Sequence, residues 1–147
     1  MNTSRERSPS VMNRDITWDE VGAWCERIVL RVKSETPDIK LVAGIARGGL
    51  IPAAIIAYRL GIPTIPISLM NDPFYVIDMD PKDVLIVDDV CDTGQTFKEL
   101  NAYLRGIEFP TAVLLAKPWI SEPRDHFFQP RFIAEWTTEW AAFPWEK

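Results

Sequence analysis

The sequence is organised around one stretch of thirteen residues, VLIVDDVCDTGQT, which runs from Val84 to Thr96. It opens with an uninterrupted apolar run, which is typical of a strand buried on both faces of a parallel sheet. Two carboxylates, Asp88 and Asp89, follow at the carboxyl end of that strand, and an Asp-Thr-Gly turn comes next. A helix is expected from Gln95, because apolar residues then recur on one helical face: Phe97, Leu100 and Leu104. The chain is therefore predicted to have an α/β fold.

The polar part of this stretch fits a phosphorylated sugar. The first amides of a helix have no partners within the helix, and the helix dipole favours an anion there. Gly94 allows close approach of the backbone to a phosphate, and Thr93 and Thr96 add hydroxyl donors. Asp88 and Asp89 suit ribose hydroxyls or a divalent metal between carboxylates and phosphates. The alternative is an ordinary strand–helix crossover with solvated acids.

The thirteen residues closely resemble the phosphoribosyl pyrophosphate (PRPP) signature of the type I phosphoribosyltransferases. The resemblance implies a single-domain α/β fold, with a central, mostly parallel sheet flanked by helices and a small C-terminal hood. Residues 14–147 are expected to form this domain. Residues 1–13, which are polar and rich in Ser, Arg and Asn, are expected to be a disordered tail.

Composition narrows the range of partners. The net charge is -5, and no cluster of Lys and Arg occurs outside the N-terminal tail, which argues against a nucleic-acid surface. No apolar run approaches the length of a membrane span. The two cysteines, Cys25 and Cys91, lack metal-like spacing and are expected to be free thiols in a reducing, cytoplasmic setting.

Patterns along the rest of the chain predict alternating helices and strands. A capping box, Thr17 to Glu20, predicts a helix start, and Pro37 ends that element. The buried face of this helix is expected to hold Val21, Trp24, Cys25, Ile28 and Val32. A second helix is predicted over 50–60, and further strands over 39–45, 63–69, 111–116 and 131–136.

A second candidate anion site follows the strand predicted over 39–45. Gly48 and Gly49 allow backbone amides to face an anion, and Arg47 can clamp it. Ala46-Arg47-Gly48-Gly49 resembles the pyrophosphate loop of the same family, often Ser-Arg-Gly-Gly, with Ala46 in place of Ser. The resemblance implies a cis peptide bond between Ala46 and Arg47.

Further segments resemble the xanthine-guanine and hypoxanthine group: ITWDE near the start, AKP at 116–118 and TTEWAAFPWE at the end. In that group a lysine donates to the purine 6-oxo oxygen, and Lys117 matches it. A C-terminal aromatic stacks on the base, and Trp140 matches best, with the backbone around Ala141 and Ala142 at the purine 2-position. Asp92 matches the proposed catalytic acid/base near purine N7.

The resemblance implies purine salvage: transfer of ribose 5-phosphate from PRPP to guanine, xanthine or hypoxanthine, with release of pyrophosphate. Mg²⁺ is the implied cofactor, with Asp88 and Asp89 as its ligands. A homo-oligomer, dimer or tetramer, is also implied. The implied PRPP-binding residues are Arg47, Gly48, Gly49, Asp88, Asp89, Asp92, Thr93, Gly94, Gln95 and Thr96.

Two alternatives remain open. One is a regulator that senses PRPP or a nucleotide without turnover, which is favoured by the short segment 70–82 where the family has a long mobile loop. Phe74 and Tyr75 are candidates for a small fixed lid, and 75–79 for a short strand. The other is an enzyme for a pyrimidine, which Lys117 and the tail disfavour.

The tail aromatics Trp140, Phe143 and Trp145 either pack on the core or an interface, or stack on a ligand.

Overall fold

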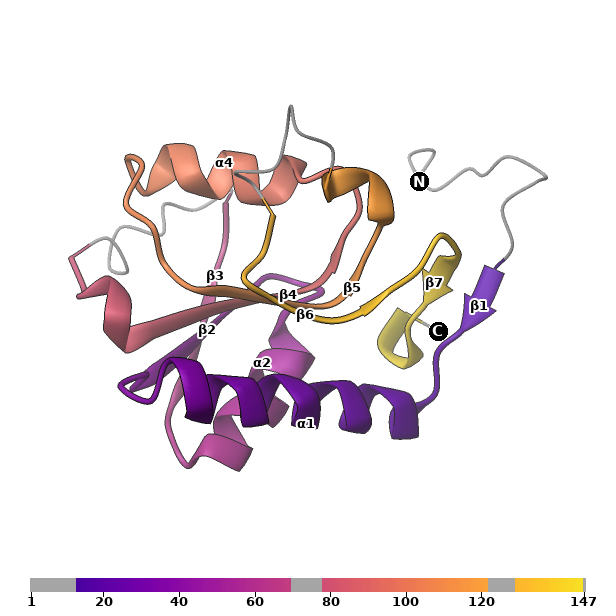
Figure 1. The fold of residues 1–147 in the computed structure, drawn as a ribbon, viewed down its shortest axis with the longest axis horizontal. Coiled ribbons are helices and arrows are strands. Elements are labelled where there is room, and N and C mark those ends of the chain that lie inside the picture. The colour runs from indigo at the N-terminus through magenta and orange to yellow at the C-terminus, as the bar shows by residue number, and fades with distance from the viewer. Residues whose placement is uncertain (1–12, 70–77, 122–128, 147) are drawn as a thin grey trace.

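The fold is organised around a five-stranded sheet in which every neighbouring pair of strands is parallel (Figure 1). The computed structural model describes residues 13–69, 78–121 and 129–146. The strand order is β3-β2-β4-β5-β6. The strands are β2 (Leu41–Ile45), β3 (Thr64–Ile67), β4 (Val84–Cys91), β5 (Thr111–Ala116) and β6 (Phe132–Trp136). This confirms the predicted α/β class and parallel sheet.

Helices cover both faces of the sheet. Helices α1 (Trp18–Glu35) and α2 (Leu50–Leu60) lie on one face, and α4 (Gln95–Tyr103) lies on the other (Figure 1). Single 3₁₀ turns occur at η2 (Pro81–Asp83), η3 (Pro118–Ser121) and η5 (Pro144–Glu146). Because each strand of a parallel pair is reached by a crossover, this layering is what such a sheet requires.

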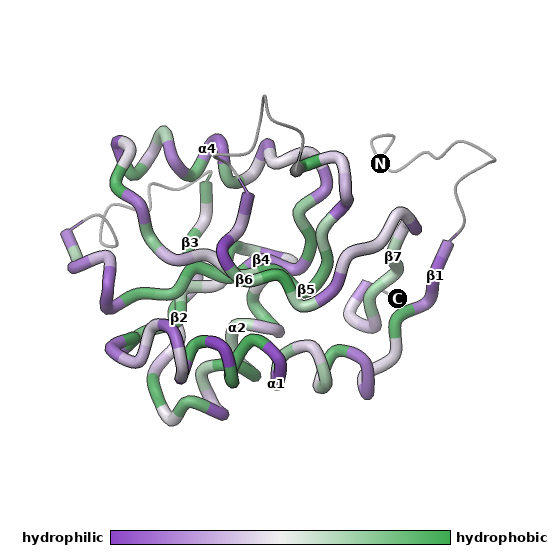
Figure 2. Tube along the Cα trace, viewed as in Figure 1, coloured by the Kyte–Doolittle hydropathy of each residue, from purple (hydrophilic) through white to green (hydrophobic). Residues whose placement is uncertain are grey.

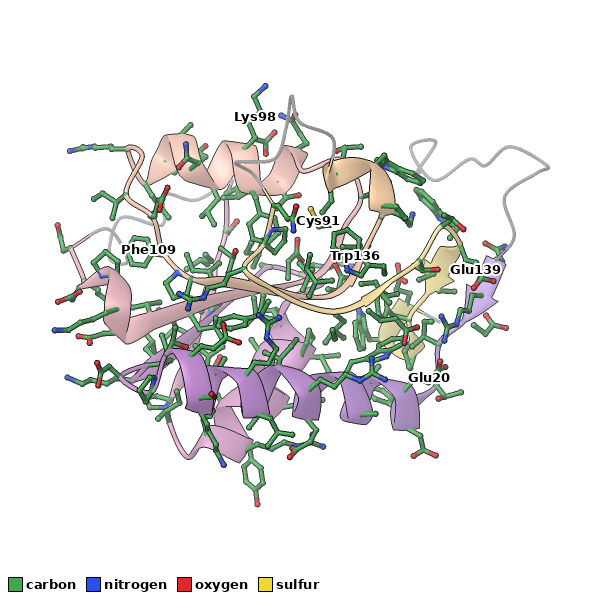
Figure 3. All side chains as sticks on the ribbon, in the orientation of Figure 1. Glu20, Cys91, Lys98, Phe109, Trp136 and Glu139 are labelled. Atoms are coloured by element: carbon green, nitrogen blue, oxygen red, sulfur yellow. The ribbon has the colours of Figure 1, made fainter. Side chains whose placement is uncertain are left out.

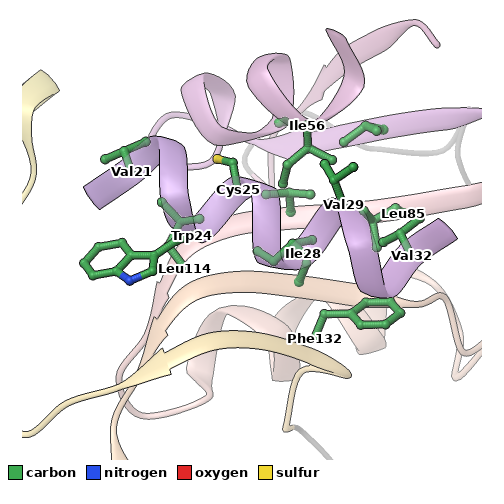
Figure 4. Close-up of a cluster of buried hydrophobic side chains, with 14 of the residues drawn as sticks. Val21, Trp24, Cys25, Ile28, Val29, Val32, Ile56, Leu85, Leu114 and Phe132 are labelled. Atoms are coloured by element: carbon green, nitrogen blue, oxygen red, sulfur yellow. The ribbon is translucent and has the colours of Figure 1, made fainter. Parts of the chain in front are cut away.

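Helix α1 begins with the predicted capping box. The Glu20 amide donates to Thr17 Oγ1 at 3.1 Å, and the Thr17 amide donates to Glu20 Oε1 at 3.1 Å. The predicted apolar face is buried against α2 and the sheet, as the close-up in Figure 4 shows. Its buried residues are Val21, Trp24, Cys25, Ile28, Val29 and Val32.

Two apolar clusters, one on each side of the sheet, form the core. One packs α1 and α2 against the sheet, and the other contains Phe97, Leu100 and Leu104 from the α4 side. The central strands are apolar along nearly their whole length (Figure 2), since both of their faces are covered. The predicted apolar face of α4 is therefore confirmed.

Strand β4 is longer than the sequence indicated. The apolar run predicted a strand of four residues followed by the acids, but β4 continues through Asp88 and Asp89 to Cys91. Its pairing with β2 ends at Gly44 and Val87, whereas its pairing with β5 continues to Cys91 and Ala116. The two carboxylates therefore lie within β4 but beyond the end of β2.

A separate two-stranded parallel sheet forms the hood. It pairs β1 (Asn13–Asp15) with β7 (Trp140–Ala142), so the hood joins the two ends of the domain. Neither strand was predicted from the sequence, and Asn13, which was expected in the tail, is the first residue of β1. The hood is continued by an amide hydrogen bond of 2.9 Å from Ile16 to the carbonyl of Ala142.

The cation of Arg14 ties the hood to the rest of the domain. Its guanidinium bonds to Glu20 of α1, and to Glu135 Oε2 of β6 at 3.1 Å. It also lies 4.0 Å from Glu139 Oε1 and 5.6 Å from the centroid of the Trp24 ring. Glu20 and Glu139, both labelled in Figure 3, lie on the side of the molecule where hood and helix meet.

Several sequence predictions concern segments outside the described residues. These are the tail up to residue 12, the proposed lid residues Phe74 and Tyr75, and most of the strand proposed over 75–79. Within residues 13–69, 78–121 and 129–146, no helix has the combined length and apolar character that a membrane span requires.

Replacing the Arg14 guanidinium should destabilise the domain. Arg14→Met keeps the aliphatic stem but leaves Glu20 and Glu135 without their shared cation, and we expect the free energy of unfolding to fall by about 1–2 kcal/mol. Chemical denaturation at neutral pH measures this. Lys82→Met, which removes an exposed ion pair with Asp80, is the control and should cost under about 0.5 kcal/mol. Equal effects of the two substitutions would contradict the role given to Arg14.

Candidate functional site

A pocket of about 400 Å³ opens at the carboxyl end of β4. The predicted signature loop, the predicted lysine and the predicted hood residues all line it, although they come from separate parts of the chain. The lining residues are Asp88, Asp89, Val90, Cys91, Asp92, Thr93, Gly94, Gln95, Thr96, Phe97, Lys117, Trp140 and Ala141.

The loop with Arg47, Gly48 and Gly49 packs directly against this end of β4. A Cβ atom on Gly48 would lie 2.4 Å from Asp89 Oδ2, and one on Gly49 would lie 2.3 Å from the carbonyl oxygen of Val87. Neither position has room for a side chain. The glycines therefore bring the loop into contact with the signature carboxylates, a packing reason that the sequence did not reveal.

The backbone of this loop differs in part from its predicted role. The peptide bond between Ala46 and Arg47 is cis, as the family resemblance implied. The Gly49 amide, however, donates to the carbonyl oxygen of Ile45 at 2.8 Å. In this structure that amide serves the loop itself, so the prediction that both glycine amides face an anion does not describe Gly49.

Asp88 and Asp89 form a buried pair of carboxylates. Each is only 8% exposed. Burial, reinforced by the neighbouring Asp89 carboxylate, raises the pKa of Asp88 well above its usual range. The pair makes two local hydrogen bonds: Asp88 Oδ1 accepts from the Asp89 amide at 2.9 Å, and Asp89 Oδ1 accepts from the Val90 amide at 2.7 Å. Two adjacent acids in this setting favour a bound cation or hydroxyl donors.

The loop after β4 delivers the start of helix α4 to the pocket. Gly94 adopts φ of 82°, a left-handed conformation that favours glycine, and α4 begins at the next residue. The Thr93 hydroxyl accepts a hydrogen bond of 3.2 Å from the Gln95 amide. The first turn of the helix therefore lines the pocket together with Thr93 and Thr96, which suits an anion.

Lys117 places a cation at the other end of the pocket. Its side chain is 3% exposed, and Nζ lies 3.4 Å from Asp92 Oδ1. Nζ also lies 4.6 Å from the centroid of the Trp140 ring and 5.2 Å from that of Trp119. Of these residues, Asp92, Lys117 and Trp140 were predicted as site residues from the sequence, whereas Trp119 was not. A single tryptophan after Lys-Pro forms no motif that would indicate a role in a site.

The donor set fits a hard divalent cation only in part. Among the described residues, no group of three or more His, Cys, Asp or Glu side chains could hold a metal. Asp88 and Asp89 supply oxygen ligands of the kind that Mg²⁺ prefers, and Mg²⁺ commonly completes its shell with waters and substrate phosphates. The pair therefore fits a cation that arrives with a phosphorylated substrate.

Both cysteines are free thiols, as predicted, and both are buried. Burial raises the pKa of each thiol to about 12. Cys91 lines the pocket, but a thiol with so high a pKa is a poor nucleophile at neutral pH.

The tail aromatics divide between the two predicted roles: Trp140 lines the pocket, whereas Phe143 is buried and stacks on Trp145 with ring centroids 4.7 Å apart.

Comparison with known proteins agrees with this geometry. No family model matches the chain. The xanthine-guanine phosphoribosyltransferase of Idiomarina loihiensis (strain ATCC BAA-735 / DSM 15497 / L2-TR) is 31% identical, over 89% of this chain and 85% of that protein. The protein of the same name from Cereibacter sphaeroides (strain ATCC 17025 / ATH 2.4.3) is 26% identical, over 97% of this chain and 92% of its own length.

Solved structures give the same result. A purine phosphoribosyltransferase from Pyrococcus horikoshii Ot3 has a TM-score of 0.72 and 30% identity, covering 92% of this chain and 94% of its own. A Neisseria gonorrhoeae protein with bound ppGpp has a TM-score of 0.73, but at 20% identity, over 95% of this chain and 92% of its own, it shows only the fold. The fold is that of the type I phosphoribosyltransferases. Within that class of enzymes, the chain belongs to the purine phosphoribosyltransferases.

The two loop glycines should differ in their tolerance of a methyl group. Gly49→Ala places Cβ against backbone atoms, and we expect it to lower the free energy of unfolding by about 3 kcal/mol or more. Gly48→Ala places Cβ against a side chain that can move, so the protein should fold with a displaced Asp89 and weakened binding of Mg²⁺ with a phosphorylated substrate. Thermal unfolding and calorimetric titration measure the two effects.

Gly22→Ala is the matched control for these substitutions. A Cβ there would lie 3.5 Å from its nearest neighbour, Arg59 Nη2, and alanine favours the helix, so stability should rise by up to about 1 kcal/mol. Unchanged stability in Gly49→Ala would show that the loop does not depend on this close packing.

Neutralising Asp88 should stabilise the metal-free protein. The raised pKa means that the folded protein holds the Asp88 proton more tightly than the unfolded chain, so stability falls as the pH rises above about 4. Asp88→Asn removes that loss, and its melting temperature should exceed the wild-type value increasingly as the pH rises above about 4. Melting curves in the presence of a chelator measure the difference. Asp38→Asn, at an exposed position, should change little, and a lower melting temperature of Asp88→Asn at neutral pH would contradict the burial argument.

Proposed function

We propose that this enzyme transfers the 5-phosphoribosyl group of PRPP to N9 of a 6-oxopurine in the presence of Mg²⁺. The bond between C1′ and the pyrophosphate oxygen breaks, and pyrophosphate leaves with the electron pair. The bond between C1′ and purine N9 forms while Asp92 accepts the proton from N7. Guanine, xanthine and hypoxanthine all carry the 6-oxo group, and the two curated relatives are named for the first two.

The observation that carries this proposal is the convergence of Asp92, Lys117 and Trp140 in one pocket. The Lys117 ammonium lies 3.4 Å from the Asp92 carboxylate and 4.6 Å from the centre of the Trp140 ring. A planar base stacked on Trp140 would meet both polar groups at its edge. Lys117 supplies a donor for a 6-oxo oxygen, and Asp92 supplies an acceptor within reach of the adjacent ring nitrogen.

The hood supplies the remaining purine contacts in this proposal. Trp140 offers a stacking face, and the backbone of Ala141 lies next to it in β7, at the purine 2-position. Ala141 pairs with Arg14 in β1, so the segment that reads the base is fixed by a strand and by the Arg14 cation. A neutral base would gain stacking on the indole and directional hydrogen bonds at its edge.

PRPP is assigned to the opposite part of the pocket. The hydroxyls of Thr93 and Thr96 hold the 5′-phosphate together with amides of residues 92–96 other than that of Gln95, which donates to Thr93 Oγ1. Asp88 and Asp89 hold the ribose hydroxyls and the metal. Arg47 and Gly48 hold the pyrophosphate from the loop that packs beside the pocket, against the end of β4, while Gly49 contributes by having no side chain. Mg²⁺, when bound, would neutralise charge that develops on the leaving pyrophosphate.

A regulator that binds nucleotides without turnover is the second candidate. The Neisseria gonorrhoeae protein with bound ppGpp shows a nucleotide bound to a protein of this fold. Lys117, Asp92 and Arg47 favour the enzyme, since a sensor would not need an acid/base group beside a base-recognition lysine.

Product formation separates the two candidates. The protein is incubated with PRPP, Mg²⁺ and a panel of purine and pyrimidine bases, and nucleotide and pyrophosphate are both measured. The enzyme proposal predicts a nucleotide from at least one 6-oxopurine and none from uracil or orotate. Binding of PRPP without any product from the panel would support the regulator instead.

Lys117 should determine affinity for the base rather than for PRPP. Lys117→Met keeps the length of the side chain and removes the charged donor, and we expect the purine KM to rise by about 10- to 100-fold. The KM for PRPP should change by less than about threefold, because Lys117 lies at the base end of the pocket. Lys82→Met is the exposed control, and equal changes in both KM values would mean that Lys117 acts only on the structure.

A further inference from the structure

The indole of Trp119 makes a polar contact with the loop that carries Asp92. Trp119 belongs to the 3₁₀ turn after β5, and its Nε1–H donates to the backbone carbonyl oxygen of Asp92 at 2.6 Å. The residue is 46% exposed, so burial alone does not fix its position. The contact joins two segments that are separated by 27 positions in the sequence.

This contact continues the hydrogen bonding between the segments of β4 and β5 beyond the last paired residues of the two strands. The ladder ends at Cys91 and Ala116, and the Lys117 amide then donates to the Cys91 carbonyl oxygen at 3.0 Å. The Trp119 bond holds the next peptide, that of Asp92. Asp92 opens the turn into α4, so this bond joins the start of that turn to the 3₁₀ turn that follows β5.

Trp119 also faces the Lys117 ammonium. Nζ lies 5.2 Å from the centroid of the Trp119 ring, within the range of a cation–π interaction. The Trp140 ring, at 4.6 Å, provides the second aromatic contact. Trp140 is among the residues that line the pocket, whereas Trp119 is not, so Trp119 contacts the lysine from outside the volume assigned to the base.

We propose that Trp119 is a positioning residue that fixes Asp92 and Lys117 relative to each other. This inference rests on the proposed function, in which Asp92 accepts a proton and Lys117 donates to the 6-oxo oxygen. The indole N–H sets the position of the Asp92 peptide, and the indole ring sets the position of the ammonium. One side chain outside the pocket thereby couples proton transfer to recognition of the base.

Two substitutions separate the contributions of the N–H and the ring. Trp119→Phe keeps an aromatic face and removes the donor, so kcat should fall by about 3- to 10-fold with the KM for PRPP unchanged. Trp119→Leu removes both the donor and the aromatic face. Its purine KM should be about 2 to 5 times that of Trp119→Phe. Trp136→Phe changes a similarly exposed tryptophan, which is labelled in Figure 3, and should leave all three constants at wild-type values.

The outcomes distinguish this inference from the proposed function. If wild-type protein forms no nucleotide, the proposed function is wrong and this inference fails with it. If wild-type protein is active and Trp119→Phe matches it in kcat, only the role of Trp119 is overturned. A parallel rise in both KM values together with a lower melting temperature would also overturn it, because that pattern indicates a general structural role. A selective fall in kcat at an unchanged melting temperature would support it.

Discussion

Close packing between a glycine loop and the end of β4 is the constraint on which the site depends. Gly49 approaches the backbone of Val87 and Asp88 so closely that a methyl group would overlap with it, and Gly48 abuts the Asp89 carboxylate. Strand β2 ends at Ile45 and turns into this loop, while β4 continues. Two carboxylates are thus buried beside a loop that carries Arg47, and the raised pKa of Asp88 records the electrostatic cost. A cation bound beside the two carboxylates would lower that cost, because a positive charge favours their ionised forms.

The residues proposed to bind the base are positioned by other parts of the fold than the glycine loop. Lys117 follows β5 directly, so its position is set by the sheet, but Trp140 and Ala141 belong to a hood that pairs with β1 near the other end of the domain. The hood has only three residues in each strand, and two such strands are not stable alone. It is attached by Arg14, which contacts acids from α1 and β6, and by Ala141 and Phe143, which are buried in the core cluster that includes α1. If Trp140 and Ala141 bind the base as proposed, its recognition depends on β1 and on the ion pairs of Arg14.

The sequence predicted much of this arrangement because its strongest patterns are local. The run 84–87, the capping box at Thr17 and the helical spacing of α4 each lie within a few residues, and the structure confirms all three. Strands β1 and β7 were missed, since three residues are too few for an alternating pattern and their pairing joins positions 13 and 140. The packing role of Gly48 and the contact of Trp119 with Asp92 were also missed, because each depends on a neighbour distant in sequence. The sequence linked the Gly48-Gly49 loop to the signature acids only through the family resemblance, and the structure packs both glycines against that end of β4.

The linkage between metal and PRPP is the most direct test of the proposed site. Mn²⁺ replaces Mg²⁺ as a spectroscopic probe, and free Mn²⁺ is followed by electron paramagnetic resonance, with PRPP alone measured as the blank. Because Asp88 and Asp89 are only a partial ligand set, we expect weak binding of Mn²⁺ to the protein and at least about tenfold tighter binding once PRPP is present, with the same factor for PRPP in the presence of Mn²⁺. The gain should disappear in Asp88→Asn. Binding of Mn²⁺ that is equally tight with and without PRPP, or a gain that persists in Asp88→Asn, would contradict the assignment of the metal and the substrate to this pair of carboxylates.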